Sequence, residues 1–269
     1  MAVPRAEHYT IPELLACFLS REIEDGETAV VGANSPIPRA AVLLAHLTHG
    51  PNIRLHLSLT VTNLFTVPVL ESFEFESDYR QTIWAEAYYT NVDEMSALRL
   101  LRNVRFYVGA LQVDSYGNQN LLGIGSDYKK LKFRGPGPIG TQTLGDHVKC
   151  TYILLNRHDR RTFVEKMDFR TAVGWDGGGA DARKKLGLPG GGPRYCVTPL
   201  CIMNFEEQSK RMGLKSVHPG VAVDQVVENT GFDLVIPRDV PVTDPPTEEE
   251  LRILRARIDT EGLLRQEEK

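Results

Sequence analysis

The sequence predicts an α/β protein with an open, mostly parallel sheet and flanking helices. Short β-branched or apolar segments alternate along the chain with segments of helical periodicity, and this alternation is typical of parallel sheets. The strongest strand candidate, residues 105–114, is apolar enough to be covered on both faces. Because loops that leave the carboxyl ends of such strands build binding sites, we expect the functional site there.

The elements begin with a helix, a strand, a loop and a second helix. Thr10 and Glu13 form a capping box, and the apolar residues that follow recur at helical spacing until Gly26. A largely buried helix is expected over 37–48, and a last helix with an apolar stripe begins after Thr247. The expected strands are 28–31, 53–59, 105–114, 152–155 and 194–197.

The composition favours one large globular domain over residues 1–269. Of the 269 residues, 42% are hydrophobic and 25% are charged, and the formal net charge is −4. Without a long run of Lys or Arg, the chain lacks the charge pattern of nucleic-acid or anionic-membrane binders, so we expect a small substrate. No stretch reaches the roughly 18 apolar residues that span a bilayer, and the segment MAVPRAEHYT lacks the continuous apolar region of a signal peptide, so we expect a cytoplasmic protein.

Neither a metal site nor a disulfide framework is predicted. The four cysteines are widely spaced, and the nearest pair, Cys196 and Cys201, has no second pair to complete a zinc site. The histidines show no metal-binding spacing. We therefore expect reduced thiols and no metal.

Residues 174–192 concentrate glycine far above the average of the chain. Such a segment is either a flexible insertion or a functional lid or partner contact. The pattern does not decide between them.

The turn from Gly135 to Gly140 formally fits the dinucleotide-binding pattern G-x-G-x-x-G. Pro136 and Pro138 lack the N–H groups which that fingerprint needs, so we reject a dinucleotide site. In one interpretation glycine lets the backbone approach a ligand, and the N–H groups of Gly137, Ile139 or Gly140 face a developing oxyanion. A purely structural tight turn fits the spacing equally well.

Two further groups of polar residues lie at or near predicted strand ends. His56 and Ser58 lie two apart on one strand face, as a base and nucleophile or as two unrelated neighbours. The second group follows strand 105–114 and either carries function or closes the turn through side-chain hydrogen bonds. Its members are Gln112, Asp114, Gly117, Asn118 and Asn120.

From about residue 11 to residue 260 the chain resembles the β subunits of family I CoA-transferases, especially glutaconate CoA-transferase. Together the matching segments are specific, although none would suffice alone. They are GANSP at 32–36, GPNIRLHLS at 50–58, ALQVDSYGNQN at 110–120, KFRGPGPIG at 132–140, MDFRTAVGW at 167–175, RKKLGLPG at 183–190 and ENTGFDL at 228–234.

The resemblance implies the open α/β CoA-transferase fold and a homologous α subunit as partner, in a heterotetramer of two α and two β chains. It also implies an active site at their interface that handles an acyl-CoA. No permanently bound cofactor is implied, because coenzyme A enters as part of the substrate. In true transferases of this family a β-subunit glutamate attacks the thioester and splits the reaction into two easier steps.

The position that matches this glutamate holds Ser58, and the strand offers no other carboxylate. A serine cannot form the same acyl anhydride. The chain also resembles a steroid-ring-opening hydrolase and a decarboxylase that share the fold and lack the β-subunit glutamate, and in the hydrolase the working glutamate belongs to the α subunit. The hypothesis is therefore hydrolysis or C–C bond cleavage of the CoA thioester of a carboxylated acyl group.

Two alternatives remain: CoA transfer with a carboxylate from elsewhere, and a noncatalytic scaffold subunit. The resemblance assigns Ser58 and His56 to the acyl pocket. It places Gly135, Gly137, Gly140 and Asn34 on the oxyanion and CoA-binding side, and Gln112, Asp114, Gly117, Asn118 and Asn120 in the ordering of the adjoining loop.

Overall fold

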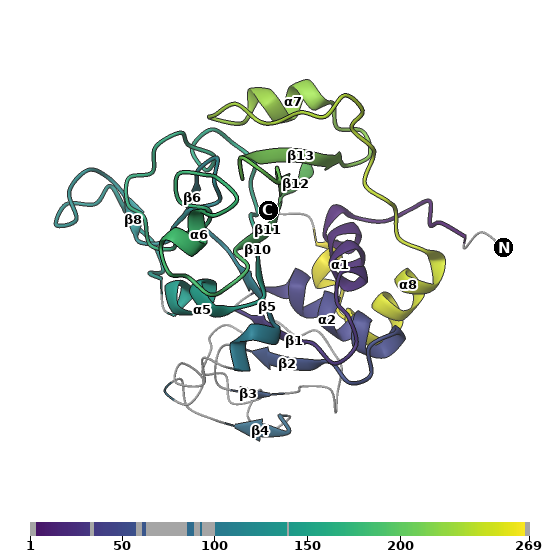
Figure 1. Ribbon diagram of the computed structural model, residues 1–269. Helices are drawn as coiled ribbons and strands as arrows, with labels where there is room; N and C mark the ends of the chain where they lie inside the picture. The colour runs from purple at the N-terminus through teal and green to yellow at the C-terminus, as the bar shows by residue number, and fades with distance from the viewer. Residues whose placement is uncertain are drawn as a thin grey trace. The chain divides into compact units, whose positions relative to one another are not determined.

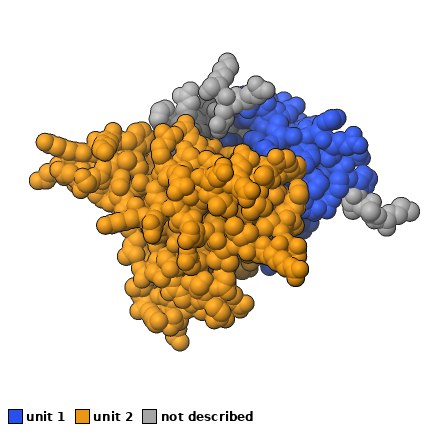
Figure 2. Space-filling model, turned by 90° about the horizontal axis from the view of Figure 1, so that it is seen from above, with its two compact units in different colours: residues 1–97, 244–269 blue, residues 98–243 orange. Residues whose placement is uncertain are grey.

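The computed structural model describes residues 4–32, 35–57, 61–62, 85–88, 92, 100–138 and 140–266 (Figure 1). The chain forms two compact units, coloured separately in Figure 2. Unit 1 contains residues 1–97 and 244–269, and unit 2 contains residues 98–243. Two compact units can belong to one folding domain, so the expected single domain over 1–269 stays a prediction.

Unit 2 has parallel strands at one side of its sheet and antiparallel strands at the other. The strand order is β13, β12, β11, β10 and β5. The parallel strands are β5 (Val104–Val108), β10 (Cys150–Leu154) and β11 (Pro193–Val197). The antiparallel strands are β12 (Cys201–Phe205) and β13 (Met212–Val217). β5 is buried along its whole length, as a strand covered on both faces must be.

Short elements surround this sheet in unit 2. The helices are η1 (Leu100–Asn103), α5 (Thr141–His147), α6 (Ala182–Lys185) and α7 (Val223–Glu228). Two small hairpins pair β6 (Gln112–Val113) with β7 (Gln119–Asn120), and β8 (Gly123–Ile124) with β9 (Phe133–Arg134). α7 is anchored by Val226, which is fully buried in the same hydrophobic cluster as Met203 and Leu214.

Unit 1 combines parallel strands with helices that pack together (Figure 1). Its strands are β1 (Thr28–Val31), β2 (Arg54–Leu57), β3 (Val61–Thr62) and β4 (Ala87–Tyr88). β1 and β2 are parallel, whereas β3 and β4 add antiparallel pairs. The helices are α1 (Ile11–Arg21), α2 (Pro36–Thr48), α8 (Glu248–Ile253), a π-helical turn η2 (Leu254–Ile258) and η3 (Leu263–Arg265).

The predicted α/β fold is confirmed, with differences in the bounds of some elements and with further short elements that were not predicted. The predicted strand 105–114 is two strands, because the chain leaves the sheet after Val108 and β6 pairs with β7 instead. Strands β12 and β13 were not predicted. They come after the glycine-rich segment and extend the sheet as a hairpin, for which the sequence pattern gives little signal. The four cysteines are free and buried.

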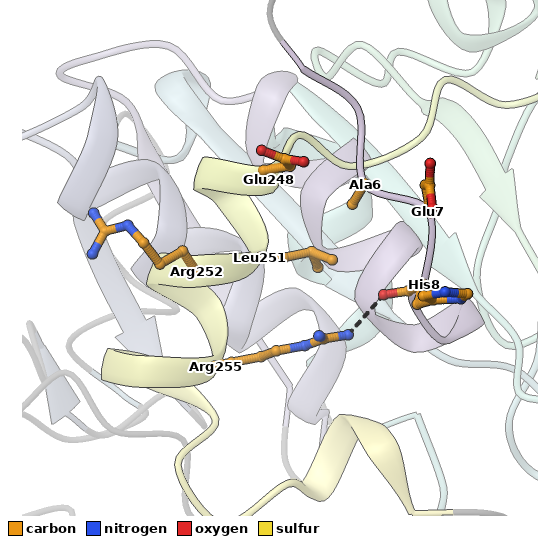
Figure 3. A pocket seen from close by; sticks show the side chains of 7 residues that line it. All are labelled: Ala6, Glu7, His8, Glu248, Leu251, Arg252 and Arg255. Atoms are coloured by element: carbon orange, nitrogen blue, oxygen red, sulfur yellow. Dashed lines mark hydrogen bonds between the residues drawn. The ribbon is translucent and has the colours of Figure 1, made fainter.

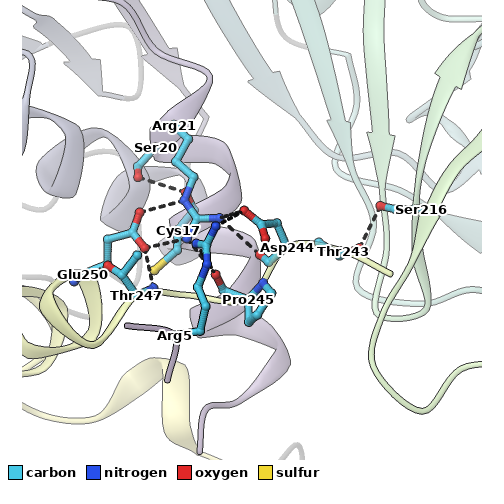
Figure 4. A network of polar contacts seen from close by, with 10 residues as sticks. All are labelled: Arg5, Cys17, Ser20, Arg21, Ser216, Thr243, Asp244, Pro245, Thr247 and Glu250. Atoms are coloured by element: carbon cyan, nitrogen blue, oxygen red, sulfur yellow. Dashed lines mark hydrogen bonds and ion pairs between the residues drawn. The ribbon is translucent and has the colours of Figure 1, made fainter. Parts of the chain in front are cut away.

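Two capping boxes in unit 1 share their glutamates with arginines of other segments. The Glu13 carboxylate accepts a hydrogen bond from the Thr10 N–H. It also accepts hydrogen bonds from Arg255 Nε and Nη2 at 2.7 and 2.9 Å. Glu250 likewise caps Thr247 and forms a bidentate pair with Arg21, shown in Figure 4. Burial would raise the pKa of Glu13, but the hydrogen bonds from Arg255 and Thr10 lower it below its usual value. Each pair therefore joins α1 to the C-terminal segment.

Replacing Glu13 with glutamine is expected to cost about 2 kcal/mol of unfolding free energy. Glu13 is 0% exposed and Arg255 is 38% exposed, so the arginine regains part of its hydration when the charge is lost. Glu249 forms a similar bidentate pair with Arg252 on the surface, and Glu249→Gln serves as the matched control with no measurable change. Urea unfolding of both variants checks this, and equal midpoints would contradict it.

Candidate functional site

The polar loop between β6 and β7 is closed by Asp114 and Asn118. The Asp114 carboxylate accepts hydrogen bonds from the N–H groups of Tyr116 and Asn118, both at 3.0 Å, and from Asn118 Nδ2 at 2.8 Å. Asn118 also donates to the Asp176 carbonyl oxygen and accepts from the Gly174 N–H, both at 2.8 Å. Burial raises the pKa of Asp114, although these hydrogen bonds oppose the shift. The pair fixes the loop and ties it to the segment at 174–176.

A buried amide pair fixes the strands of the same hairpin. Asn120 Nδ2 donates to Gln112 Oε1 at 2.7 Å and to the Gly123 carbonyl oxygen at 2.8 Å. Gln112 Oε1 also accepts from the Asp168 N–H at 3.0 Å. Asn120 is fully buried, so these bonds satisfy polar atoms that water cannot reach. The contacts order the hairpin, and the functional role that the sequence also allowed for these residues stays a prediction.

Gly117 completes the turn because no larger residue fits there. Its φ is +69°, and an added Cβ would lie 2.6 Å from the Phe205 ring. The segment at Gly174 approaches the same turn so closely that a Cβ there would lie 2.4 Å from the Gly117 carbonyl carbon and oxygen. The two chain segments are therefore in backbone contact at this point.

The glycine-rich segment 174–192 is held in place by Arg183. Its guanidinium is buried and donates to the carbonyl oxygens of Val173, Gly174, Gly145 and Gly190 at 2.7 to 3.1 Å. Trp175 adds a hydrogen bond from Nε1 to the Pro193 carbonyl oxygen. Sequence reasoning missed Arg183 as an anchor, because nothing in a run of basic residues marks which one is buried.

The glycine turn lies directly after β9. The N–H of Gly135 donates to the Leu122 carbonyl oxygen at 2.8 Å, and that of Gly137 to the Leu121 carbonyl oxygen at 3.0 Å. In this conformation neither N–H group is available to an oxyanion, so that role stays a prediction which requires the turn to open. Gly140 caps α5 with a φ of +68°, and Gly137, with a φ of +88°, has open space around its missing side chain.

The remaining predicted site residues belong to unit 1. His56 lies on β2, where it pairs in register with Val30 of β1 and Thr62 of β3. Its side chain is partly exposed. Ser58 and Asn34 lie outside the described residues, so the predicted pairing of His56 with Ser58 stays a prediction.

Unit 2 also contains a buried polar network that sequence reasoning missed. His158 lies between the hydroxyls of Thr198 and Thr230, at 2.9 and 3.1 Å, and burial lowers its pKa to about 4. His218 contacts the Thr243 hydroxyl and the Thr198 carbonyl oxygen. Cys201 Sγ lies 3.7 Å from His158 Nδ1, but burial raises the pKa of this thiol to about 12. The network therefore holds buried segments together through hydrogen bonds and provides no reactive thiolate at neutral pH.

A shallow depression of about 410 Å³ in unit 1 is lined by none of the predicted site residues (Figure 3). Arg255, which lines it, already pairs with Glu13 and donates to the His8 carbonyl oxygen. Its other lining residues are Ala6, Glu7, His8, Glu248, Leu251 and Arg252. Across the described part of the chain, no group of three His, Cys, Asp or Glu side chains is placed to hold a metal ion. Nor is any helix of that part long and apolar enough to cross a membrane.

Together these features define an α/β protein in which hydrogen bonds order the loops that follow the strands. Comparison with known families identifies the class of protein. Residues 13–229 match the family model described as coenzyme A transferase, which is more than half of the chain. The chain belongs to the coenzyme A transferase family.

Its relatives include the β subunits of two CoA-transferases over nearly the whole length. The chain is 38% identical to the β subunit of 3-oxoadipate CoA-transferase from Pseudomonas knackmussii, covering 92% of this chain and 93% of that one. It is 30% identical to the β subunit of glutaconate CoA-transferase from Acidaminococcus fermentans, covering 94% and 93%. The crystal structure of the latter enzyme superposes with a TM-score of 0.84 at 28% identity, covering 97% of this chain and 99% of that chain.

A third relative is named as a subunit of a hydrolase and not of a CoA-transferase. The cholesterol ring-cleaving hydrolase IpdB subunit of Rhodococcus jostii is 30% identical over 58% of this chain and 60% of its own length. Its crystal structure shares the fold at 23% identity with a TM-score of 0.79, covering 96% and 97%. The same fold therefore carries both transferases and a hydrolase.

Proposed function

We propose that this chain is the β subunit of a hetero-oligomeric enzyme that acts on the CoA thioester of a carboxylated acyl group. One observation carries the proposal. Over 92% and 94% of its length the chain matches β subunits of enzymes named for 3-oxoadipate and glutaconate, which are both dicarboxylates. The partner is a homologous α subunit, in a heterotetramer of two α and two β chains.

The reaction that we favour is hydrolysis or C–C bond cleavage. Ser58 occupies the position where the resemblance places the transferase glutamate, and no carboxylate lies in residues 53–59. Without a carboxylate the acyl anhydride of a transferase cannot form on this strand. The hydrolase relative shows that the family includes enzymes named for ring cleavage. In this proposal the catalytic carboxylate comes from the α subunit.

The residues of this chain then have supporting roles. Ser58 and His56 line the acyl pocket, and Asn34 with the glycine turn borders the CoA side. The loop closed by Asp114 and Asn118 keeps the neighbouring backbone rigid, which preserves the orientation of a bound thioester.

The test is to assemble the chain with the α subunit from its neighbouring gene. Without any acceptor acid, 3-oxoadipyl-CoA and glutaconyl-CoA are followed for release of free thiol, which reports hydrolysis, and for a new acyl-CoA product, which reports C–C bond cleavage. We expect turnover that needs both subunits and that falls when Ser58 or His56 is replaced by alanine. Absence of turnover together with absence of CoA binding would contradict the proposal.

CoA transfer is the second candidate, and one observation favours it. The two relatives whose sequence alignments cover 92% and 94% of the chain are both named as transferases. Here the attacking carboxylate lies elsewhere in the assembly. Formation of a new acyl-CoA from an isotopically labelled acid separates transfer from hydrolysis. Tight association with the α subunit, together with unchanged activity on replacing Ser58, His56 and Gly137, would indicate a scaffold role instead.

A further inference from the structure

A basic hairpin projects from unit 2 directly before the glycine turn (Figure 1, loop joining β8 and β9). Lys129, Lys130, Lys132 and Arg134 are all exposed, and Asp127 is the only acidic residue between 126 and 134. The whole chain, by contrast, has a formal net charge of −4. The hairpin is therefore locally basic in a chain that is acidic overall.

The hairpin also carries two exposed aromatic side chains. Tyr128 is 59% exposed and Phe133 is 55% exposed, both among the most exposed large hydrophobic residues described. An aromatic ring that is left in water next to lysines provides a stacking surface for a nucleobase beside cations for phosphates.

The base of the hairpin is fixed, so these groups are presented in a defined place. The Gly125 N–H donates to Asp168 Oδ2 at 2.8 Å, and the Lys132 N–H donates to the Ile124 carbonyl oxygen at 2.8 Å. Gly123 lies so close to β9 that an added Cβ would be 2.5 Å from the Phe133 carbonyl oxygen. At the tip, Asp127 Oδ1 accepts from the Lys129 N–H and forms a tight turn.

We infer that this hairpin binds the nucleotide end of the CoA thioester. The inference rests on the proposed function and adds to it the part of the chain that holds the phosphates. From Gly135 to Tyr128 an extended backbone spans at most about 23 Å at about 3.3 Å per residue, comparable with the length of an extended pantetheine arm. A thioester at the glycine turn therefore places its diphosphate and 3′-phosphate within reach of the lysines. Lysine is well suited to phosphates as a mobile point charge.

The experiment compares two charge-matched triple variants in the assembled enzyme. One carries Lys129→Gln, Lys130→Gln and Lys132→Gln. The control carries Lys166→Gln, Arg238→Gln and Arg257→Gln, which removes the same charge from exposed positions elsewhere. Binding of coenzyme A and of pantetheine is measured by calorimetry, and KM is measured for an acyl-CoA and for the matching acyl-pantetheine.

We expect the hairpin variant to bind coenzyme A about tenfold more weakly, with a smaller difference at high salt. Pantetheine binding and the KM for acyl-pantetheine should not change, and the control should behave like the wild type. Unchanged coenzyme A affinity would overturn the inference. Loss of assembly with the α subunit would also overturn it, because the hairpin would then be a protein-docking surface. Wild-type coenzyme A binding without turnover would refute only the proposed reaction, since the binding comparison still tests the hairpin.

Discussion

Gly135→Ala is expected to lower the free energy of unfolding by about 3 kcal/mol and to reduce turnover by the assembled enzyme about 100-fold. An added Cβ at Gly135 would lie 2.3 Å from the Leu121 carbonyl oxygen and 2.5 Å from Leu111 Cδ1. The first contact is with backbone, which cannot rotate away as a side chain can. The turn or the strand beside it must therefore move, and the proposed thioester site moves with it.

Two neighbouring glycines serve as controls for this prediction. Gly137→Ala meets nothing within 4 Å, but its φ of +88° is strained for alanine, so a cost of about 1 kcal/mol is expected. Gly145→Ala, in α5, also meets nothing and should stabilise by up to about 1 kcal/mol. Urea unfolding and turnover are measured for all three variants. A Gly135 variant that behaves like the Gly145 variant would show that the turn adapts freely.

The protein is expected to lose about 3 kcal/mol of unfolding free energy through His158 as the pH falls from about 6.5 to about 4. Burial lowers the pKa of His158 from 6.5 to about 4, although Asp159 acts in the opposite direction. Between these values the unfolded chain binds a proton that the folded chain does not. Stability is therefore full above pH 6.5 and falls on acidification. The pKa of His218 is also lowered by burial, which adds to the same trend.

His158→Gln separates this effect from general acid denaturation. Glutamine can keep hydrogen bonds to Thr198 and Thr230 but does not titrate. The variant should have a flatter dependence of unfolding free energy on pH between 6.5 and 4.5, whatever its stability at pH 7.5. His8→Gln, at an exposed position, is the control and should keep the wild-type slope. An unchanged slope in the His158 variant would assign the acid sensitivity to other groups.

The N-terminal ends of α1 and α8 could be predicted from the local sequence because capping is a local interaction. Thr10 with Glu13 is a capping box in the structure as predicted, and the predicted helix after Thr247 also begins with a capping box, formed by Thr247 with Glu250. What the sequence could not show is that each glutamate also pairs with an arginine more than two hundred residues away. Such pairs depend on which helices pack together, and the packing of helices cannot be inferred from the spacing of residues along the chain.

For the candidate site, too, the sequence predicted some features and only the structure showed others. Local pattern identified the polar loop after β5 and the glycine turn, since turn residues at a strand end have a recognisable composition. The local pattern did not show whether the polar side chains contact a ligand or close the loop through hydrogen bonds. That distinction depends on where each polar atom finds its partner, and Asn118 finds two of its partners at Gly174 and Asp176, more than fifty residues away.

The sequence by itself determined the α/β class, the parallel strands, the helices α1, α2 and α8, and the family resemblance that points to a CoA thioester. These follow from periodicity, capping and short motifs, which are properties of neighbouring residues. Only the tertiary structure decided that the N–H groups of Gly135 and Gly137 donate to the carbonyl oxygens of Leu122 and Leu121. It alone also decided that Arg183 is the buried anchor of the glycine-rich segment. Burial and hydrogen-bond partners arise when distant segments pack, so they exist only in the folded chain.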